Sequence, residues 1–188
     1  KCAQELSDAH VDVMGYACLV AIMSMGRGYH CVSEVNLHQE TVANDFPTPI
    51  VTSAGALING LKVLGAKQIS IITPYMRPLT DKVVDYIEHQ GIKVKESIAL
   101  EIPDNLEVAA QNPMNLLEIY KQLDLTEVDV LVASACVQMP SLEAIDLIQA
   151  ECGIPVTSAA VCTTYEMMKK LGIETKSAIG GELLSGKY

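Results

Sequence analysis

The chain has 188 residues, enough for one large domain or two small ones with a real hydrophobic core. Thirteen basic and 23 acidic residues give a net charge of −10, which opposes binding to nucleic acid and to anionic membranes. No apolar run approaches the roughly 20 residues of a membrane-spanning helix, and the opening KCAQELSDAH has no apolar signal core. We therefore expect a soluble, cytoplasmic protein that holds any anionic substrate with local dipoles.

Six cysteines lie at wide spacings, with no CxxC motif and no Cys/His cluster, and the four histidines are equally scattered. This spacing gives no support to a zinc, haem or other metal site. Reduced thiols in a cytosolic protein are the expected state. The cysteines are Cys2, Cys18, Cys31, Cys136, Cys152 and Cys162.

In chain order, GRGYH at 26–30 lacks the GxGxxG and GxxxxGK[ST] patterns and follows a helix, so it indicates a glycine turn rather than a phosphate loop. From residue 67 onward, strand and helix patterns alternate strictly, which predicts a parallel sheet flanked by helices. The predicted strands are 67–75, 92–100, 128–136 and 154–159, and the predicted helices are 77–91, 112–125 and 141–153.

An internal repeat links the two halves. VDVMGYAC matches VDVLVASAC and brings Cys18 onto Cys136, while PIVTSAGALINGLKVLG resembles PVTSAAVCTTYEMMKKLG farther along. A duplicated unit predicts two flavodoxin-like (Rossmann-like) α/β lobes with pseudo-two-fold symmetry, the last helix from about Thr163 returning to the first lobe. We assign 1–66 plus 157–188 to the first lobe and 67–156 to the second. The repeat also predicts a strand and a helix, on the order of 50 residues, before Lys1.

Both aligned cysteines follow predicted strands, at the carboxyl ends where open α/β sheets bind ligands. We expect a helix N-terminus after each, because free N–H groups there favour a thiolate and bind carboxylates. The predicted anion-binding amides are those of Leu19, Val20, Val137 and Gln138. A single such cysteine is most often a small core residue, but the duplication favours a site.

Two further side chains are candidates for substrate binding. Tyr75 ends a predicted strand, where its hydroxyl either donates to a substrate oxygen or caps the core. Asn105 lies in a loop beyond the next strand, as an amide donor or a turn former. The other four cysteines have no counterpart across the repeat and are assigned structural roles. No histidine is assigned to catalysis, although His30 next to Cys31 stays open.

The segments YACLVAIM, VTSAGAL, TPYMRPLT, LEIPDNLEV and SACVQMPSL together resemble those of the maleate cis-trans isomerases, within the aspartate/glutamate racemase superfamily. The resemblance covers nearly all 188 residues, in the family's order. Only the start departs, because the family's early asparagine-bearing segment has no equivalent here.

The resemblance implies cofactor-independent conversion of maleate to fumarate, a step of bacterial nicotinate degradation. It implies that Cys18 adds to the double bond to give a succinyl-cysteine, with Cys136 on the opposite face as acid/base or steering thiol. The amides named above, with Tyr75 and Asn105, would stabilise the enediolate. A small dicarboxylate is then the partner, and a homodimer the expected assembly.

Two other readings stay open at the level of sequence. The cysteine pair also suits a two-base racemase or a decarboxylase, in which each thiol exchanges a proton with a carbon acid. Two α/β lobes around a cleft also suit a non-catalytic module that clamps a dicarboxylate.

Overall fold

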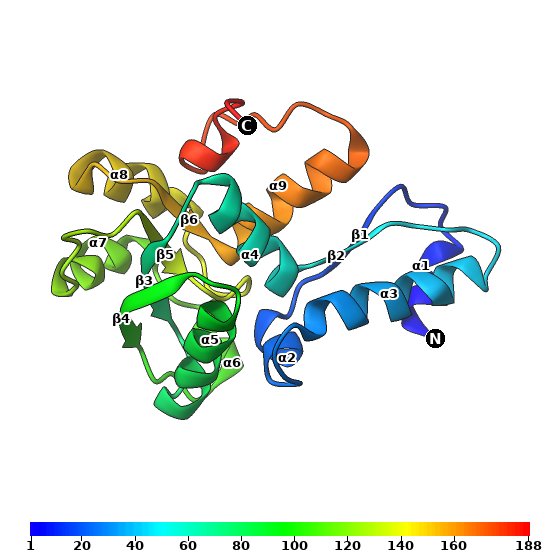
Figure 1. Ribbon diagram of the computed structural model, residues 1–188, viewed down its shortest axis with the longest axis horizontal. Coiled ribbons are helices and arrows are strands. Elements are labelled where there is room, and N and C mark those ends of the chain that lie inside the picture. The colour runs from blue at the N-terminus through cyan, green and yellow to red at the C-terminus, as the bar shows by residue number, and fades with distance from the viewer.

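The computed structural model describes residues 1–188 (Figure 1). Short strands alternate with helices along the whole chain. The strands are β1 (Met14–Tyr16), β2 (Ile50–Thr52), β3 (Gln68–Thr73), β4 (Lys93–Ala99), β5 (Val130–Ser134) and β6 (Val156–Ser158). The α helices are α1 (Cys2–Ser7), α2 (Leu19–Met23), α3 (Tyr29–Val42), α4 (Ser53–Val63), α5 (Arg77–His89), α6 (Asn105–Ala109), α7 (Leu116–Ile119), α8 (Leu142–Cys152) and α9 (Ala159–Leu171).

The larger sheet has four parallel strands in the order β4-β3-β5-β6. All five residues of β5 and the last five of β3 are buried, as their continuous apolar runs require of strands covered on both faces. This order is the flavodoxin-like one. β4 is added on one side of β3, and β5 and β6 are added on the other side. The order of the strands therefore reverses between β3 and β5, and a crevice opens at the carboxyl ends of these two strands.

The smaller sheet pairs β1 with β2 in parallel, and its link to the larger sheet repeats a local motif. Thr52, the last residue of β2, accepts a hydrogen bond from the N–H of Gly55 at 3.1 Å and caps α4. Ser158, the last residue of β6, caps α9 in the same way through the N–H of Val161 at 3.2 Å. The duplicated VTSA sequences therefore form the same strand-to-helix turn.

Helices α4 and α9 pack against each other between the two sheets (Figure 1). Their contact needs a glycine, because a Cβ added to Gly60 would lie 2.6 Å from the Cys162 sulfur. One apolar cluster of 38 buried side chains extends from α2 through the larger sheet to the C-terminal segment. The two halves therefore share one core, which fixes the loops of one against the loops of the other.

The predicted α/β class and strand-helix alternation are confirmed. The single helix predicted over 112–125 is wrong, because that segment forms two 3-10 turns around the one-turn α7. The last helix begins at Ala159, ahead of Thr163, because Ser158 caps it there. The lobe boundaries stay a prediction, although β6 pairs within the larger sheet. No helix is both long and apolar enough to cross a membrane.

Candidate active site

Cys18 is the N-cap residue of α2, two residues beyond the end of β1. Its side chain is exposed, whereas the next residue, Leu19, is only 1 % exposed and anchors the helix in the core. The N–H groups of a first helical turn have no intrahelical acceptor. The N–H groups of Leu19 and Val20 donate to nothing else in the chain, so they are free to bind an anion beside the thiol.

Cys136 follows β5 and is held by a hydroxyl two residues earlier. The buried Ser134 Oγ accepts a hydrogen bond from the Cys136 N–H at 3.3 Å and donates one to the Cys136 carbonyl at 2.9 Å. The intervening Ala135 N–H donates to the carbonyl of Ile72 at 3.0 Å, across to β3. Cys136 is 8 % exposed, so this thiol lies deeper than Cys18 and in a fixed backbone.

The helix predicted at 141–153 agrees with α8, and a short bend separates Cys136 from its N-terminus. Residues 137–139 form a bend, and α8 begins only at Leu142. The reason is local, because Met139 precedes Pro140 and a residue before proline disfavours the helical region. The predicted amides nevertheless remain available, since the N–H groups of Val137 and Gln138 donate no hydrogen bond within the chain.

Tyr75 spans the crevice between β3 and β5. Its hydroxyl donates to the carbonyl of Ala135 at 3.2 Å, next to Cys136. Burial is the largest cause that raises the pKa of Tyr75 far above its usual range, and the Cys136 and Cys18 thiols add to it. Tyr75 therefore stays protonated at neutral pH and serves as a donor.

Asn105 is the first residue of α6, which Asp104 caps by accepting the Leu106 N–H at 2.6 Å. The Gln138 side-chain amide donates to the Asn105 carbonyl at 2.8 Å and so ties α6 to the loop after Cys136. The carboxamide of Asn105 itself makes no hydrogen bond in the chain and is free to meet a ligand.

These groups surround one cavity of about 140 Å³. The volume is well below the roughly 300–1,000 Å³ typical of sites for drug-sized ligands, so it suits a small metabolite. All eight residues that the sequence singled out line it, together with three that it missed: Ala17, Cys18, Leu19, Val20, Tyr75, Ile102, Asn105, Val108, Cys136, Val137 and Gln138. Ile102 and Val108 flank Asn105, and their place in the EIPDNLEV segment was the signal that could have found them.

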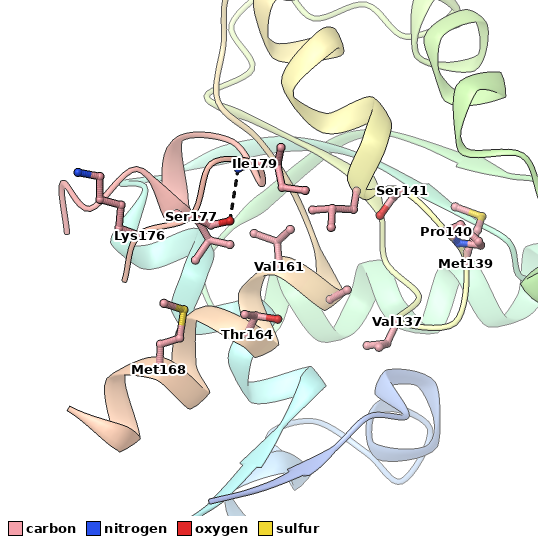
Figure 2. A pocket seen from close by; sticks show the side chains of 13 residues that line it. Val137, Met139, Pro140, Ser141, Val161, Thr164, Met168, Lys176, Ser177 and Ile179 are labelled. Atoms are coloured by element: carbon pink, nitrogen blue, oxygen red, sulfur yellow. Dashed lines mark hydrogen bonds between the residues drawn. The ribbon is translucent and has the colours of Figure 1, made fainter. Parts of the chain in front are cut away.

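The largest cavity in the chain, about 510 Å³, is a different one (Figure 2). It lies between α8, α9 and the C-terminal segment, and it shares only Val137 with the cysteine cavity. Its walls are mostly apolar, with Lys176 as the one titratable side chain and no cysteine. Size therefore does not identify the site; the convergence of thiols and hydrogen-bond donors does.

The remaining cysteines and His30 lie outside the cavity that Cys18 and Cys136 line. Cys162 is fully buried against Thr157, and burial raises the pKa of its thiol to about 12. Cys152 is half-buried. Cys2 and Cys31 lie on the surface, so these two cysteines are not core residues. His30 contacts the Tyr86 hydroxyl at 2.5 Å through Nδ1, and burial lowers its pKa. No group of three or more His, Cys, Asp or Glu side chains is placed to hold a metal ion.

Comparison with known proteins places this arrangement in a family. The family model described as arylmalonate decarboxylase matches residues 1–184. A maleate isomerase of Geobacillus stearothermophilus is 55% identical over 188 residues, which are 100% of this chain and 75% of that protein. The chain belongs to the maleate isomerase family. The resemblance drawn from its sequence motifs is thereby confirmed.

Solved maleate isomerases share the fold closely. The enzyme Iso from Pseudomonas putida S16, in a cysteine-to-alanine variant with maleate, has a TM-score of 0.98 and 59% identity over 100% of this chain and 75% of its own. The Nocardia farcinica maleate cis-trans isomerase, as a cysteine-to-serine mutant, has a covalently bound succinylcysteine intermediate. Its TM-score is 0.95, with 39% identity over 100% of this chain and 76% of that one.

Proposed function

We propose that this protein isomerises maleate to fumarate without a cofactor, through a covalent succinyl-cysteine intermediate on Cys18. The convergence of two duplicated cysteines and four unpaired backbone N–H groups on one small cavity carries the proposal. The maleate isomerases at 55% and 59% identity support the substrate. The succinylcysteine in the Nocardia mutant supports the covalent route.

Addition of a thiolate solves the central problem of the reaction, which is that the C=C bond of maleate cannot rotate. The Cys18 sulfur forms a C–S bond to one olefinic carbon, and the π electrons move onto the distal carboxylate as an enediolate. The former double bond is now single and turns. When the electrons return, the C–S bond breaks, and fumarate leaves with the thiolate regenerated.

Cys136 supplies the proton that this route needs if it passes through the succinyl thioether. Its thiol protonates the carbon next to the new C–S bond, and its thiolate removes a proton from that carbon after rotation, so no net proton is consumed. The hydrogen bond that the Ser134 hydroxyl donates and the one that it accepts hold the Cys136 backbone in place for this transfer. Cys136 lies deeper than Cys18, which suits a group that exchanges a proton away from bulk water.

The donors around the cavity stabilise the enediolate. The N–H groups of Leu19 and Val20 serve the carboxylate near Cys18, and those of Val137 and Gln138 serve the one near Cys136. Tyr75 and Asn105 add a hydroxyl and a carboxamide. One preorganised donor of this kind is worth about 3 kcal/mol in comparable oxyanion sites.

The test combines turnover with trapping. Purified protein is incubated with maleate while fumarate is followed by proton NMR, and the protein is then analysed by peptide mass spectrometry. We expect Cys136→Ser to accumulate an adduct with the mass of one maleate on the Cys18 peptide, because water can protonate the enediolate while no thiolate is left to remove a proton from the thioether. We expect Cys18→Ser to form none. Cys162→Ser is the matched control, because that thiol is buried elsewhere and should leave turnover intact. Full activity in both Cys18→Ser and Cys136→Ser would refute the two-thiol route.

The racemase and decarboxylase readings predict a different outcome. A two-base exchange would introduce deuterium at the α-carbon of an amino acid or malonate in D2O, with no sulfur adduct. The binding-module reading predicts thermal stabilisation by maleate with no fumarate. The same samples therefore separate all the readings.

We further infer a cytoplasmic location and a homodimer. All six cysteines are free thiols, which is the state that a reducing compartment maintains. Large apolar side chains are exposed on α3 and just before it, namely Met25, Val32, Val35 and Val42. Light scattering on the purified protein tests the dimer, and a monomer at micromolar concentration would contradict it.

A further inference from the structure

Glu101 adopts an unusual backbone conformation beside the active site. Its φ is +53°, in the left-handed region that residues other than Gly, Asn and Asp rarely adopt. Three other non-glycine residues share this feature, but none of them is next in sequence to a residue that lines the cavity: His10, Asp45 and Glu127. Glu101 directly precedes the cavity residue Ile102. A strained residue at such a place indicates that its side chain or its N–H group is used.

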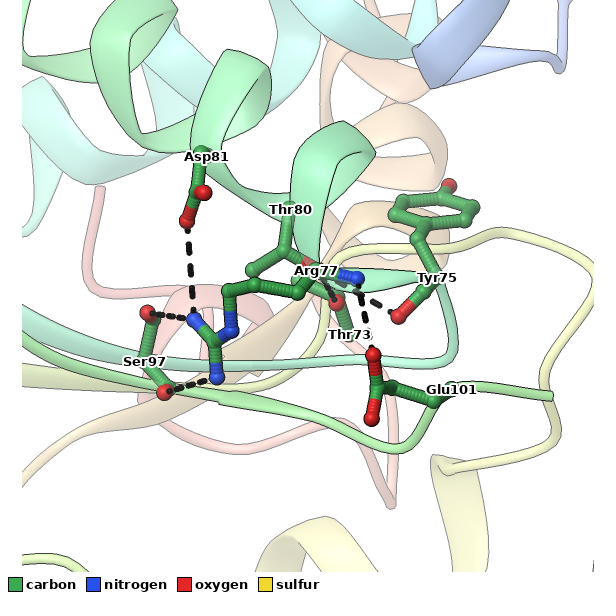
Figure 3. Close-up of polar contacts among 7 residues, drawn as sticks. All are labelled: Thr73, Tyr75, Arg77, Thr80, Asp81, Ser97 and Glu101. Carbon is green, nitrogen blue, oxygen red and sulfur yellow. Dashed lines mark hydrogen bonds and ion pairs between the residues drawn. The ribbon is translucent and has the colours of Figure 1, made fainter.

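Both polar groups of Glu101 hold the turn that carries Tyr75. Its N–H donates to the Tyr75 carbonyl at 3.3 Å. Its carboxylate Oε1 accepts the Arg77 N–H at 3.3 Å (Figure 3). Met76, the N-cap residue of α5, provides no side-chain cap. The Glu101 carboxylate therefore acts as a cap from outside the helix, at the end where a negative charge is favourable.

The same turn is tied down from its other sides. The Thr80 hydroxyl lies 3.4 Å from the Tyr75 carbonyl and 2.6 Å from the Thr73 hydroxyl at the end of β3. The Arg77 guanidinium donates to the Ser97 hydroxyl at 2.9 Å and to the Ser97 carbonyl at 3.2 Å, which joins α5 to β4 (Figure 3). The Tyr75 backbone is thus fixed at several points while its ring reaches the cavity.

We propose that Glu101 is a positioning residue for the Tyr75 hydroxyl, an inference that rests on the proposed role of Tyr75 as a donor to the enediolate. The left-handed turn at Glu101 directs its N–H to the Tyr75 carbonyl and its carboxylate to the Arg77 N–H, two residues farther along. The direction of the tyrosine ring depends on that backbone, because the hydroxyl, which donates its single proton to the Ala135 carbonyl in the free protein, must turn that proton to the substrate. Without the carboxylate, the first turn of α5 loosens and the hydroxyl loses its fixed place.

Three substitutions at Glu101 separate its functions. Glu101→Ala removes the carboxylate and keeps the strain, Glu101→Gly removes both, and Glu101→Gln keeps an acceptor for the Arg77 N–H. We expect kcat of the alanine and glycine variants to fall by about 10-fold to 100-fold, because a small misplacement of a reacting group has an effect of this size. KM should change much less. The glutamine variant should recover most of kcat. The glycine variant stays informative if alanine fails to fold, because it relieves the backbone strain.

A double mutant tests whether Glu101 acts through Tyr75. In a Tyr75→Phe background, Glu101→Ala should lower kcat no further, because the group that it positions is already gone. Glu127→Ala is the matched control: another glutamate with a positive φ, +58°, outside the cavity, whose loss should leave kcat unchanged. An equal loss with and without the tyrosine hydroxyl would overturn the proposal. Full activity in Tyr75→Phe would overturn it too, while adduct formation on Cys18 still reports on the proposed function separately.

Discussion

Replacing Tyr75 with phenylalanine removes a single oxygen atom at the centre of the site. The ring remains to fill the space beside Ile102 and Val108, which line the same cavity. The hydroxyl that donates to the Ala135 carbonyl at 3.2 Å is lost. Because the pKa of Tyr75 is raised by burial, the wild-type group is protonated throughout the neutral range, so the variant removes a donor and no charge.

The expected effect differs between catalysis and stability. One donor to a developing oxyanion is worth about 3 kcal/mol, which corresponds to a loss of roughly 10²-fold to 10³-fold in kcat. The Ala135 carbonyl loses one neutral hydrogen bond, which is worth about 1 kcal/mol in the free energy of unfolding. For a chain of this length, that shift lowers the melting temperature by about 2–4 °C. Catalysis should therefore suffer far more than folding.

Initial rates of fumarate formation over a range of maleate concentrations give kcat and KM, and circular dichroism gives the melting temperature. If Tyr75 binds the enediolate in preference to the substrate, kcat falls while KM stays within a few-fold. A rise in KM with kcat intact would mean that the hydroxyl only binds maleate. A variant with unchanged kcat would refute the assignment of Tyr75 as a donor in the transition state.

Three further substitutions test the surrounding structure. Ser134→Ala leaves the Cys136 N–H unpaired, so we expect unfolding in urea to cost about 1–3 kcal/mol less and kcat to fall; no change in either would contradict the positioning role. Cys162 keeps its proton up to about pH 12 in the fold but only to about pH 8.5 when unfolded, so stability should fall by roughly 1.4 kcal/mol per pH unit between them. Cys162→Ala should remove that slope from alkaline urea titrations. A hydrogen bond from Lys95 lowers the pKa of Asp124, so their contribution is present above about pH 4 and is lost as acid protonates the carboxylate. Asp124→Asn should therefore reduce the acid sensitivity of the urea midpoint, and an unchanged midpoint profile would count against the pair.

Periodicity and the internal repeat were sufficient to predict the fold class and the pairing of Cys18 with Cys136. Buried parallel strands leave continuous apolar runs in the sequence, as β5 shows, and duplicated VTSA turns leave matching letters. Position after a strand then located Tyr75, in a loop, and Asn105, which was expected in a loop and begins α6. These features depend on local sequence, so the sequence alone is enough to predict them.

Other features depend on contacts between distant segments and could not be predicted in this way. The Cys136 backbone is held by hydrogen bonds with Ser134, which in the sequence looks like one more small residue of a buried strand. Glu101 matters through a backbone angle and through contacts with a turn 24 positions earlier, neither of which leaves a pattern in composition or period. The bend that separates Cys136 from α8 reflects Pro140, which disfavours helical backbone at the preceding residue.

The cavity solves an electrostatic problem that the net charge of −10 poses for a dianionic substrate. None of its lining residues carries a formal charge at neutral pH apart from a cysteine in its thiolate form, so the negative exterior is not continued inside. Backbone N–H groups, a neutral phenol and a carboxamide supply the attraction instead. A fixed lysine or arginine would also bind maleate and fumarate strongly, which would slow release of the product. Oriented neutral donors respond most to the charge that gathers on one carboxylate as the C–S bond forms. The same weak grip on the ground state lets fumarate leave.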